Sequence, residues 1–173
     1  RLQDISPKVR QRLQPVAVVR NPWARVVSRY RFARFAVENG KSGADYAADT
    51  FEAFLEERHK WGNLPFYWHR AIRGWYNQTD YVLDESGKIA PHILRQEFLG
   101  EESQRYFNLS EPIATRNKSG TGSADYRDYY TARTIAIVAD WYKPDIELWG
   151  FDFDTAATRN AYFSTDAQKE NAP

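Results

Sequence analysis

Apolar and polar positions follow two different periods along this chain, and each period predicts a different kind of element. Short apolar runs between polar turns predict strands at residues 15–20, 81–83 and 93–97. Apolar residues spaced by three and four predict an amphipathic helix over residues 22–38. Capping residues and the same spacing predict shorter helices at residues 7–13, from residue 50 onward, and at residues 101–107, 131–142 and 144–150.

The helix over residues 22–38 is the longest of these elements, and its pattern predicts burial on more than one side. Val26, Tyr30 and Val37 share one face, whereas Phe32 and Phe35 lie off that face. The chain is long enough for a single domain, which we expect over residues 1–153, followed by a polar tail over residues 154–173.

The residues from Arg20 to Ser28 predict an anion site. Arg20 follows the apolar run of residues 16–19, Asn21 is a favourable N-cap, and Pro22 is a favourable first helical residue. Free N–H groups at a helix start attract phosphate, and Arg20 can add a bidentate pair. Ser28, two turns further on, can add a hydroxyl. The alternative interpretation is an ordinary amphipathic helix with an N-cap and surface arginines.

Charge and composition limit the classes of ligand that the chain is expected to bind. The net charge of +1 argues against a general nucleic-acid binder. Five arginines and no acidic residue lie between positions 20 and 34, a distribution that favours a small anion or an acidic glycan. The chain has no cysteine, no apolar run long enough to cross a membrane, no visible signal peptide and no metal-ligand spacing. These features favour a bacterial cytoplasmic enzyme, with the Golgi lumen as the alternative in a eukaryote.

The stretch R-N-P-W-A-R-V-V-S-R-Y, from Arg20 to Tyr30, resembles the 3'-phosphate-binding motif of sulfotransferases, R-N-P-W/Y-x-R-L/V-V-S-x-Y. It is most similar to that of the carbohydrate-type and bacterial enzymes, which use PAPS (3'-phosphoadenosine 5'-phosphosulfate) as sulfuryl donor. The resemblance implies that Arg20 and Ser28 hold the 3'-phosphate and that 3',5'-ADP is the product. It also implies an α/β, P-loop-like fold in which helices flank a parallel sheet, and it implies no metal.

Weaker similarities to the family continue to about Phe153. They comprise residues 78–87 (Q-T-D-Y…D-x-x-G), 94–99 (L-R-Q-E-F-L), 117–119 (N-K-S), 125–130 (D-Y-R-D-Y-Y) and 145–151 (D-I-E-L-W-G-F). Lys118 is a further candidate for the cofactor. Arg95 and Glu97, two residues apart on a predicted strand, are expected to pair. We expect residues 145–151 to serve packing.

Two parts of a sulfotransferase site are missing from the sequence. The family's 5'-phosphosulfate loop, P-K-x-G/A-S/T-S/T, has no counterpart, because residues 6–10 lack the small residues that wrap a phosphate. We therefore expect the chain to begin downstream of that loop, an expectation that fits its lack of methionine. The family's base often precedes the arginine motif. Within this chain His69 is the first candidate and His59 the second, whereas we expect His92 to be structural.

Aromatic and basic residues crowd residues 61–75 and predict the acceptor site. Trp68, Arg70 and Arg73 are the candidates to bind a carbohydrate or glycoconjugate that carries the acceptor hydroxyl. Core packing explains several of these aromatic residues equally well. Two other functions stay open: a P-loop-type nucleotide kinase, and a non-catalytic glycan-binding protein of the same fold. The sequence upstream of Arg1 would distinguish the three functions: a P-K-x-G-S/T-S/T turn would support the sulfotransferase, a Walker loop the kinase, and neither of them the glycan-binding protein.

Overall fold

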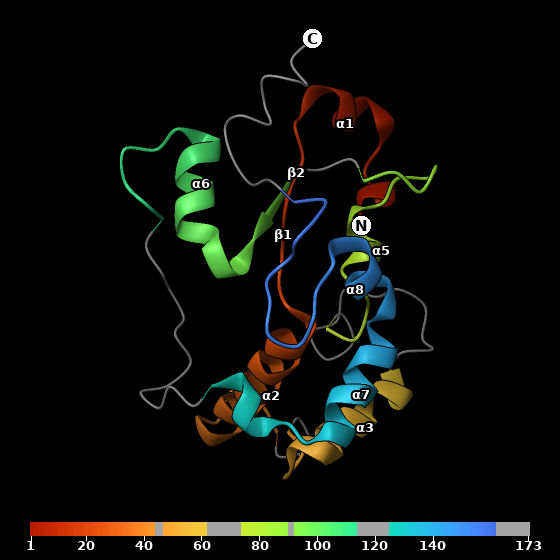
Figure 1. Cartoon of the computed structure of the whole chain (residues 1–173), viewed down its shortest axis with the longest axis vertical. Helices are drawn as coiled ribbons and strands as arrows, with labels where there is room; N and C mark the ends of the chain where they lie inside the picture. The colour runs from red at the N-terminus through yellow and green to blue at the C-terminus, as the bar shows by residue number, and fades with distance from the viewer. Residues whose placement is uncertain (44–46, 62–73, 90–91, 114–124, 162–173) are drawn as a thin grey trace. The chain divides into compact units, whose positions relative to one another are not determined.

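The computed structural model describes residues 1–43, 47–61, 74–89, 92–113 and 125–161 (Figure 1). The chain divides into two compact units. The strand unit comprises Arg1–Asn21, Gln78–Arg116 and Pro144–Pro173, and the helical unit comprises Pro22–Asn77 and Asn117–Lys143. No helix in the described part of the chain is both long and apolar enough to span a membrane.

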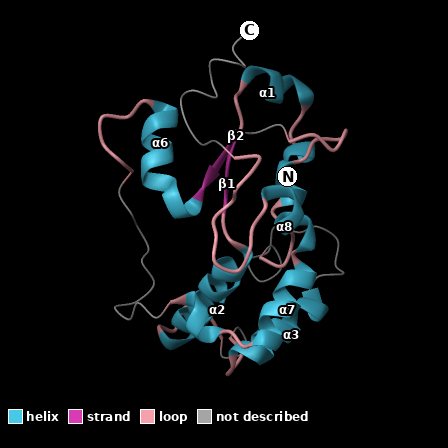
Figure 2. Ribbon diagram, in the orientation of Figure 1, coloured by secondary structure: helices cyan, strands magenta, loops and turns pink. Residues whose placement is uncertain are grey.

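A parallel pair of strands forms the centre of the strand unit. β1 (Val16–Val19) pairs with β2 (His92–Arg95) in a register that runs from Val16 opposite His92 to Val19 opposite Arg95 (Figure 2). Both strands therefore end at the same edge of the sheet. The protein is thus a mixed helix and sheet protein with a parallel sheet, as the sequence predicted. The strand predicted at residues 93–97 ends at Arg95, because a 3-10 turn (Gln96–Phe98) follows.

Short helices surround this strand pair. α6 (Leu99–Phe107) continues from the 3-10 turn and packs against β2 (Figure 1). It ends at Asn108, which adopts φ +50, a left-handed conformation that asparagine tolerates. The other helices of the unit are the 3-10 turn Leu2–Asp4, α1 (Pro7–Arg12), α5 (Thr79–Val82) and α8 (Lys143–Trp149), which belongs to this unit from Pro144 onward.

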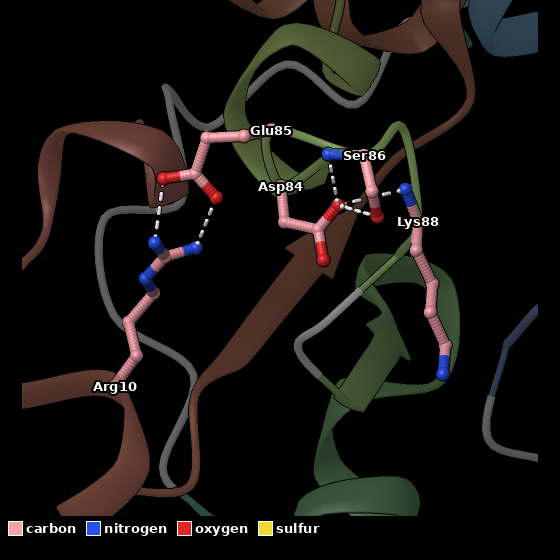
Figure 3. Close-up of polar contacts among 5 residues, drawn as sticks. All are labelled: Arg10, Asp84, Glu85, Ser86 and Lys88. Atoms are coloured by element: carbon pink, nitrogen blue, oxygen red, sulfur yellow. Dashed lines mark hydrogen bonds and ion pairs between the residues drawn. The ribbon is translucent and has the colours of Figure 1, made fainter. Parts of the chain in front are cut away.

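A tight turn after α5 is joined to α1 by an ion pair (Figure 3). Asp84 Oδ1 accepts hydrogen bonds from Ser86 N at 2.8 Å, Ser86 Oγ at 2.6 Å and Lys88 N at 3.0 Å, which lowers the pKa of Asp84. Arg10 of α1 donates two hydrogen bonds to Glu85, at 2.9 and 2.6 Å. Gly87 at φ +80 provides the left-handed position of this turn.

The helical unit packs three helices around aromatic side chains. α2 (Pro22–Glu38) packs against α3 (Phe51–Trp61) and against α7 (Ala132–Trp141), and a 3-10 turn (Tyr126–Tyr129) precedes α7. The bounds of α2 confirm the predicted helix. Buried or half-buried rings in mutual contact form the core of the unit; they are Tyr30, Phe51, Phe54, Trp75, Tyr129 and Tyr130.

Two predictions about local structure are wrong. The strand expected at residues 81–83 is absent, because α5 covers Thr79–Val82 and Leu83 makes only an isolated antiparallel bridge to Ile89. Phe32 and Phe35 are 39% and 42% exposed, so the far side of α2 is less covered than its apolar pattern predicted. The structure confirms the other predicted helices, and each of their ends lies within two residues of its predicted position. They were predicted near residues 7–13, 101–107, 131–142 and 144–150.

Candidate functional site

Arg20 lies directly after β1, at the edge of the sheet where both parallel strands end. A side chain pairs with both of its backbone groups. Arg20 N donates to Gln78 Oε1 at 2.9 Å, and Gln78 Nε2 donates to Arg20 O at 2.9 Å. The side-chain amide of Gln78 thus binds Arg20 as a neighbouring strand would. This pairing fixes the backbone from which the arginine side chain extends.

Asp145 in turn holds Gln78. Its side chain is completely buried, and it accepts four hydrogen bonds from two consecutive residues. Oδ2 accepts from Gln78 N at 2.8 Å and from Gln78 Nε2 at 3.1 Å. Oδ1 accepts from Thr79 N at 2.8 Å and from Thr79 Oγ1 at 2.7 Å. Asp145 therefore satisfies the first N–H groups of α5, which explains why a helix forms where the apolar pattern predicted a strand.

Asn21 is held on two sides within the same unit. Its backbone N–H donates to Glu97 Oε1 at 2.8 Å. Its buried side-chain amide donates to the carbonyl oxygens of Asp152, at 2.9 Å, and Thr155, at 2.8 Å. Residues 20 and 21 are therefore held by three separate segments of the strand unit: residues 78 and 97 bind their backbone, and residues 152–155 bind the side chain of Asn21.

The predicted pairing of Arg95 with Glu97 is wrong. Arg95 pairs with Glu102 of α6, whose side chain is 4% exposed: Arg95 N donates to Glu102 Oε2 at 2.6 Å, and Arg95 Nε donates to Glu102 Oε1. The prediction assumed a strand through Glu97. The 3-10 turn at Gln96 redirects the chain, so Glu97 contacts Asn21 instead and α6 brings Glu102 beside Arg95.

Ser28 lies on α2, in the helical unit, and is half-buried. No hydrogen bond joins its side chain to another residue in the described part of the chain. Its hydroxyl is thus able to donate to a ligand. Because Arg20 belongs to the strand unit, the pairing of Arg20 with Ser28 stays a prediction of the sequence motif.

The other arginines of the predicted basic cluster pack against aromatic rings of the helical unit. The guanidinium carbon of Arg31 lies 4.9 Å from the ring centre of Tyr129, and that of Arg25 lies 5.6 Å from Tyr142. Arg29 lies over Trp75 at 5.9 Å. Arg34 lies over Tyr30 at 5.9 Å. These contacts are within the range of cation–π attraction. In the described part of the chain, the arginines that α2 contributes to this cluster therefore contribute to packing.

Of the candidate bases, His59 is described, and it lies on the surface of α3. Its side chain is 60% exposed, pairs with Glu56 at 3.6 Å and lies edge-on to Trp141. His92, which the sequence predicted to be structural, packs against Tyr106 and contacts Gln14 at 2.6 Å. The candidates Trp68, His69, Arg70, Arg73 and Lys118 lie outside the described residues. Within the described ranges, no cluster of three or more His, Asp or Glu side chains is placed to hold a metal ion.

One carboxyl group with a shifted pKa was not among the candidates that the sequence predicted. Glu57 of α3 is half-buried, and burial raises its pKa, although the charges of Arg29 and Lys60 act in the opposite direction. Its signal was weak, since Glu57 stands in a continuous run of charged or titratable residues (Glu56, Arg58, His59 and Lys60).

No family model, no curated protein and no solved structure matches this chain.

Proposed function

We propose that this protein is a PAPS-dependent sulfotransferase with a P-loop-like fold, in which Arg20 and Ser28 bind the 3'-phosphate of the nucleotide. One observation carries the proposal: Arg20 lies directly after a parallel strand, and both of its backbone groups are fixed by Gln78. Ligands of open parallel sheets bind beyond the carboxyl ends of the strands. An arginine fixed at that edge suits a phosphate, because its fork-shaped donors match phosphate oxygens.

The residues present fit the 3'-phosphate in chemistry. A guanidinium supplies charge-assisted bonds to two phosphate oxygens, and a half-buried serine hydroxyl supplies a third donor. PAPS, when bound, supplies the sulfuryl group that passes to the acceptor. In this proposal Arg20 neutralises the 3'-phosphate, Ser28 donates to it, and Lys118 contributes a further cation.

The acceptor in this proposal is a hydroxyl group of a carbohydrate or glycoconjugate. Trp68 supplies a flat apolar surface on which a sugar ring stacks, and Arg70 and Arg73 pair with its anionic groups. His69 is the first candidate to take the proton of the acceptor hydroxyl, and His59 is the second.

Calorimetry with two nucleotides tests the nucleotide assignment. We expect the wild-type protein to bind 3',5'-ADP much more tightly than 5'-AMP. Arg20→Ala should weaken 3',5'-ADP binding roughly ten- to a hundredfold, because a charge-assisted hydrogen bond contributes about 1.5–3 kcal/mol. Its effect on 5'-AMP should be small. Arg12→Ala, which removes an exposed arginine of the same unit, is the matched control and should change neither affinity. Equal affinity of the wild type for both nucleotides would contradict the assignment of a 3'-phosphate site.

A further inference from the structure

We propose that Gln78 and Asp145 are positioning residues for Arg20, and that together they set the selectivity of the site for a 3'-phosphate. This inference rests on the proposed function. Neither residue needs to touch the nucleotide. Both act through the backbone of Arg20, and the hydrogen bonds described above form one continuous relay from Asp145 through Gln78 to Arg20.

Asp145 decides which way the amide of Gln78 faces. A carboxylate only accepts hydrogen bonds, so the amide nitrogen of Gln78 must face Asp145 Oδ2, at 3.1 Å. Gln78 Oε1 is then left to face Arg20 N, which is a donor, at 2.9 Å. The second N–H of the amide meets Arg20 O, also at 2.9 Å. Both donors and the acceptor of the amide are satisfied in this orientation, whereas the flipped amide would set N–H against N–H.

The relay also explains why this buried polar cluster surrounds an arginine backbone. Gln78 is 8% exposed and Asp145 is completely buried, so neither side chain gains from contact with water. Unpaired polar groups at such depth are costly, and here each has a partner. A fully satisfied network holds one geometry, which is what a guanidinium needs to meet two phosphate oxygens at once.

The measured quantity is the selectivity ratio, defined as the Kd for 5'-AMP divided by the Kd for 3',5'-ADP. Gln78→Met keeps the length of the side chain and removes its hydrogen bonds. We expect this variant to lower the ratio two- to tenfold, roughly the effect of one neutral hydrogen bond, while 5'-AMP affinity stays at the wild-type value. Thr79→Val is the matched control, because it removes one hydrogen bond from Asp145 and leaves the Arg20 contacts intact. Its ratio should equal that of the wild type.

A double-mutant cycle separates positioning from a general structural effect. In the Arg20→Ala background, Gln78→Met should leave the selectivity ratio unchanged, because there is no guanidinium left to position. A structural role would instead lower both affinities in both backgrounds. The inference is overturned if folded Gln78→Met keeps the wild-type ratio while Arg20→Ala loses it. A wild type without selectivity overturns the proposed function itself.

Hydrogen exchange covers the case in which Gln78→Met does not fold. The relay requires the Arg20 amide of the ligand-free wild type to exchange slowly, as a hydrogen-bonded buried group does. Protection of this amide that matches the amides of β2 supports the relay. An Arg20 amide that exchanges at the rate of an unstructured chain would falsify it.

Discussion

The strand unit and the helical unit hold their charged side chains by different means. In the strand unit, Asp145 and Glu102 are buried, and each meets hydrogen-bond donors at defined positions. In the helical unit, Arg25, Arg29 and Arg31 lie over aromatic rings at 4.9 to 5.9 Å. Hydrogen bonds depend on distance and angle, whereas cation–π contacts accept a range of positions.

This difference bears on where a ligand is recognised with precision. A cluster of arginines in a sequence is not by itself an anion site, since Arg25, Arg29, Arg31 and Arg34 all lie over aromatic rings in the described part of the chain. The backbone of Arg20 is fixed by a buried network of hydrogen bonds through Gln78 and Asp145. The local fixing of one backbone is therefore a better guide to the candidate site than the local density of charge.

The largest expected effect tests the polar network of the strand unit. Asp145→Asn keeps the shape of the side chain but sets an N–H₂ group against N–H donors of Gln78 or Thr79. We expect it to lower the free energy of unfolding by about 2 kcal/mol or more, because each buried group left unsatisfied costs roughly 1–3 kcal/mol. Urea unfolding measures the change. Glu147→Gln, at an exposed carboxylate of the same helix, is the control and should stay within about 0.5 kcal/mol of the wild type.

An Asp145→Asn protein as stable as the wild type would contradict the contrast between the two units. It would mean that the network tolerates rearrangement as readily as the ring contacts do, and that Gln78 is not held in one orientation.

The sequence predicts the elements near this network better than the network itself. Proline, asparagine and periodic apolar residues act locally, so the bounds of α2 and, to within one residue, the end of β1 could be predicted. The contact of Gln78 with Asp145 joins residues 67 positions apart, and no local pattern connects them. The cap that Asp145 provides also overrode the β-propensity of Tyr81 and Val82, because tertiary contacts outweigh propensity in a short element.

The wrong partner for Arg95 has a similar cause. Strand periodicity places residues two apart on one face, which favoured Glu97. The 3-10 turn that ends this periodicity carries no apolar pattern, so the approach of Glu102 could not be foreseen. The ring partners of Arg25, Arg29 and Arg31 were equally hidden, since rings from distant segments supply them.

A smaller loss of stability is expected where the side chain of Arg29 passes close to Gly74 in the helical unit. A Cβ added at Gly74 would lie 2.1 Å from Cδ of Arg29, so the arginine would have to leave its place over Trp75. We expect Gly74→Ala to cost about 1–3 kcal/mol of unfolding free energy, as overpacking of a core does. In the Arg29→Ala background the same substitution should cost less than half as much, because the three atoms nearest to the added Cβ all belong to the Arg29 side chain. Equal costs in both backgrounds, measured by urea unfolding, would show that the cost of Gly74→Ala does not come from a clash with Arg29.

The smallest effect compares one carboxyl group from each unit, with opposite signs. Burial raises the pKa of Glu57 in the helical unit, so the folded state binds more protons than the unfolded state between the two pKa values. Stability therefore falls as the pH rises through that window, and Glu57→Gln removes this loss. We expect Glu57→Gln to raise the Tm at pH 7, by the equivalent of at most about 1 kcal/mol because water screens a half-buried group. At about pH 3, below the usual pKa of glutamate, it should have no effect.

Glu85 of the strand unit is the matched control with the opposite sign. The hydrogen bonds from Arg10 lower the pKa of Glu85, so its contribution to stability is present above the unfolded pKa and is lost as the pH falls through the folded value. Glu85→Gln should therefore lower the Tm at pH 7 and have no effect at low pH, where the wild-type group is also protonated. Melting curves of both variants at pH 7 and in acid check the two signs together. If both variants shifted the Tm at pH 7 in the same direction, solvent exposure would determine how these two carboxyl groups affect stability. The different surroundings of the groups in the two units would then not determine it.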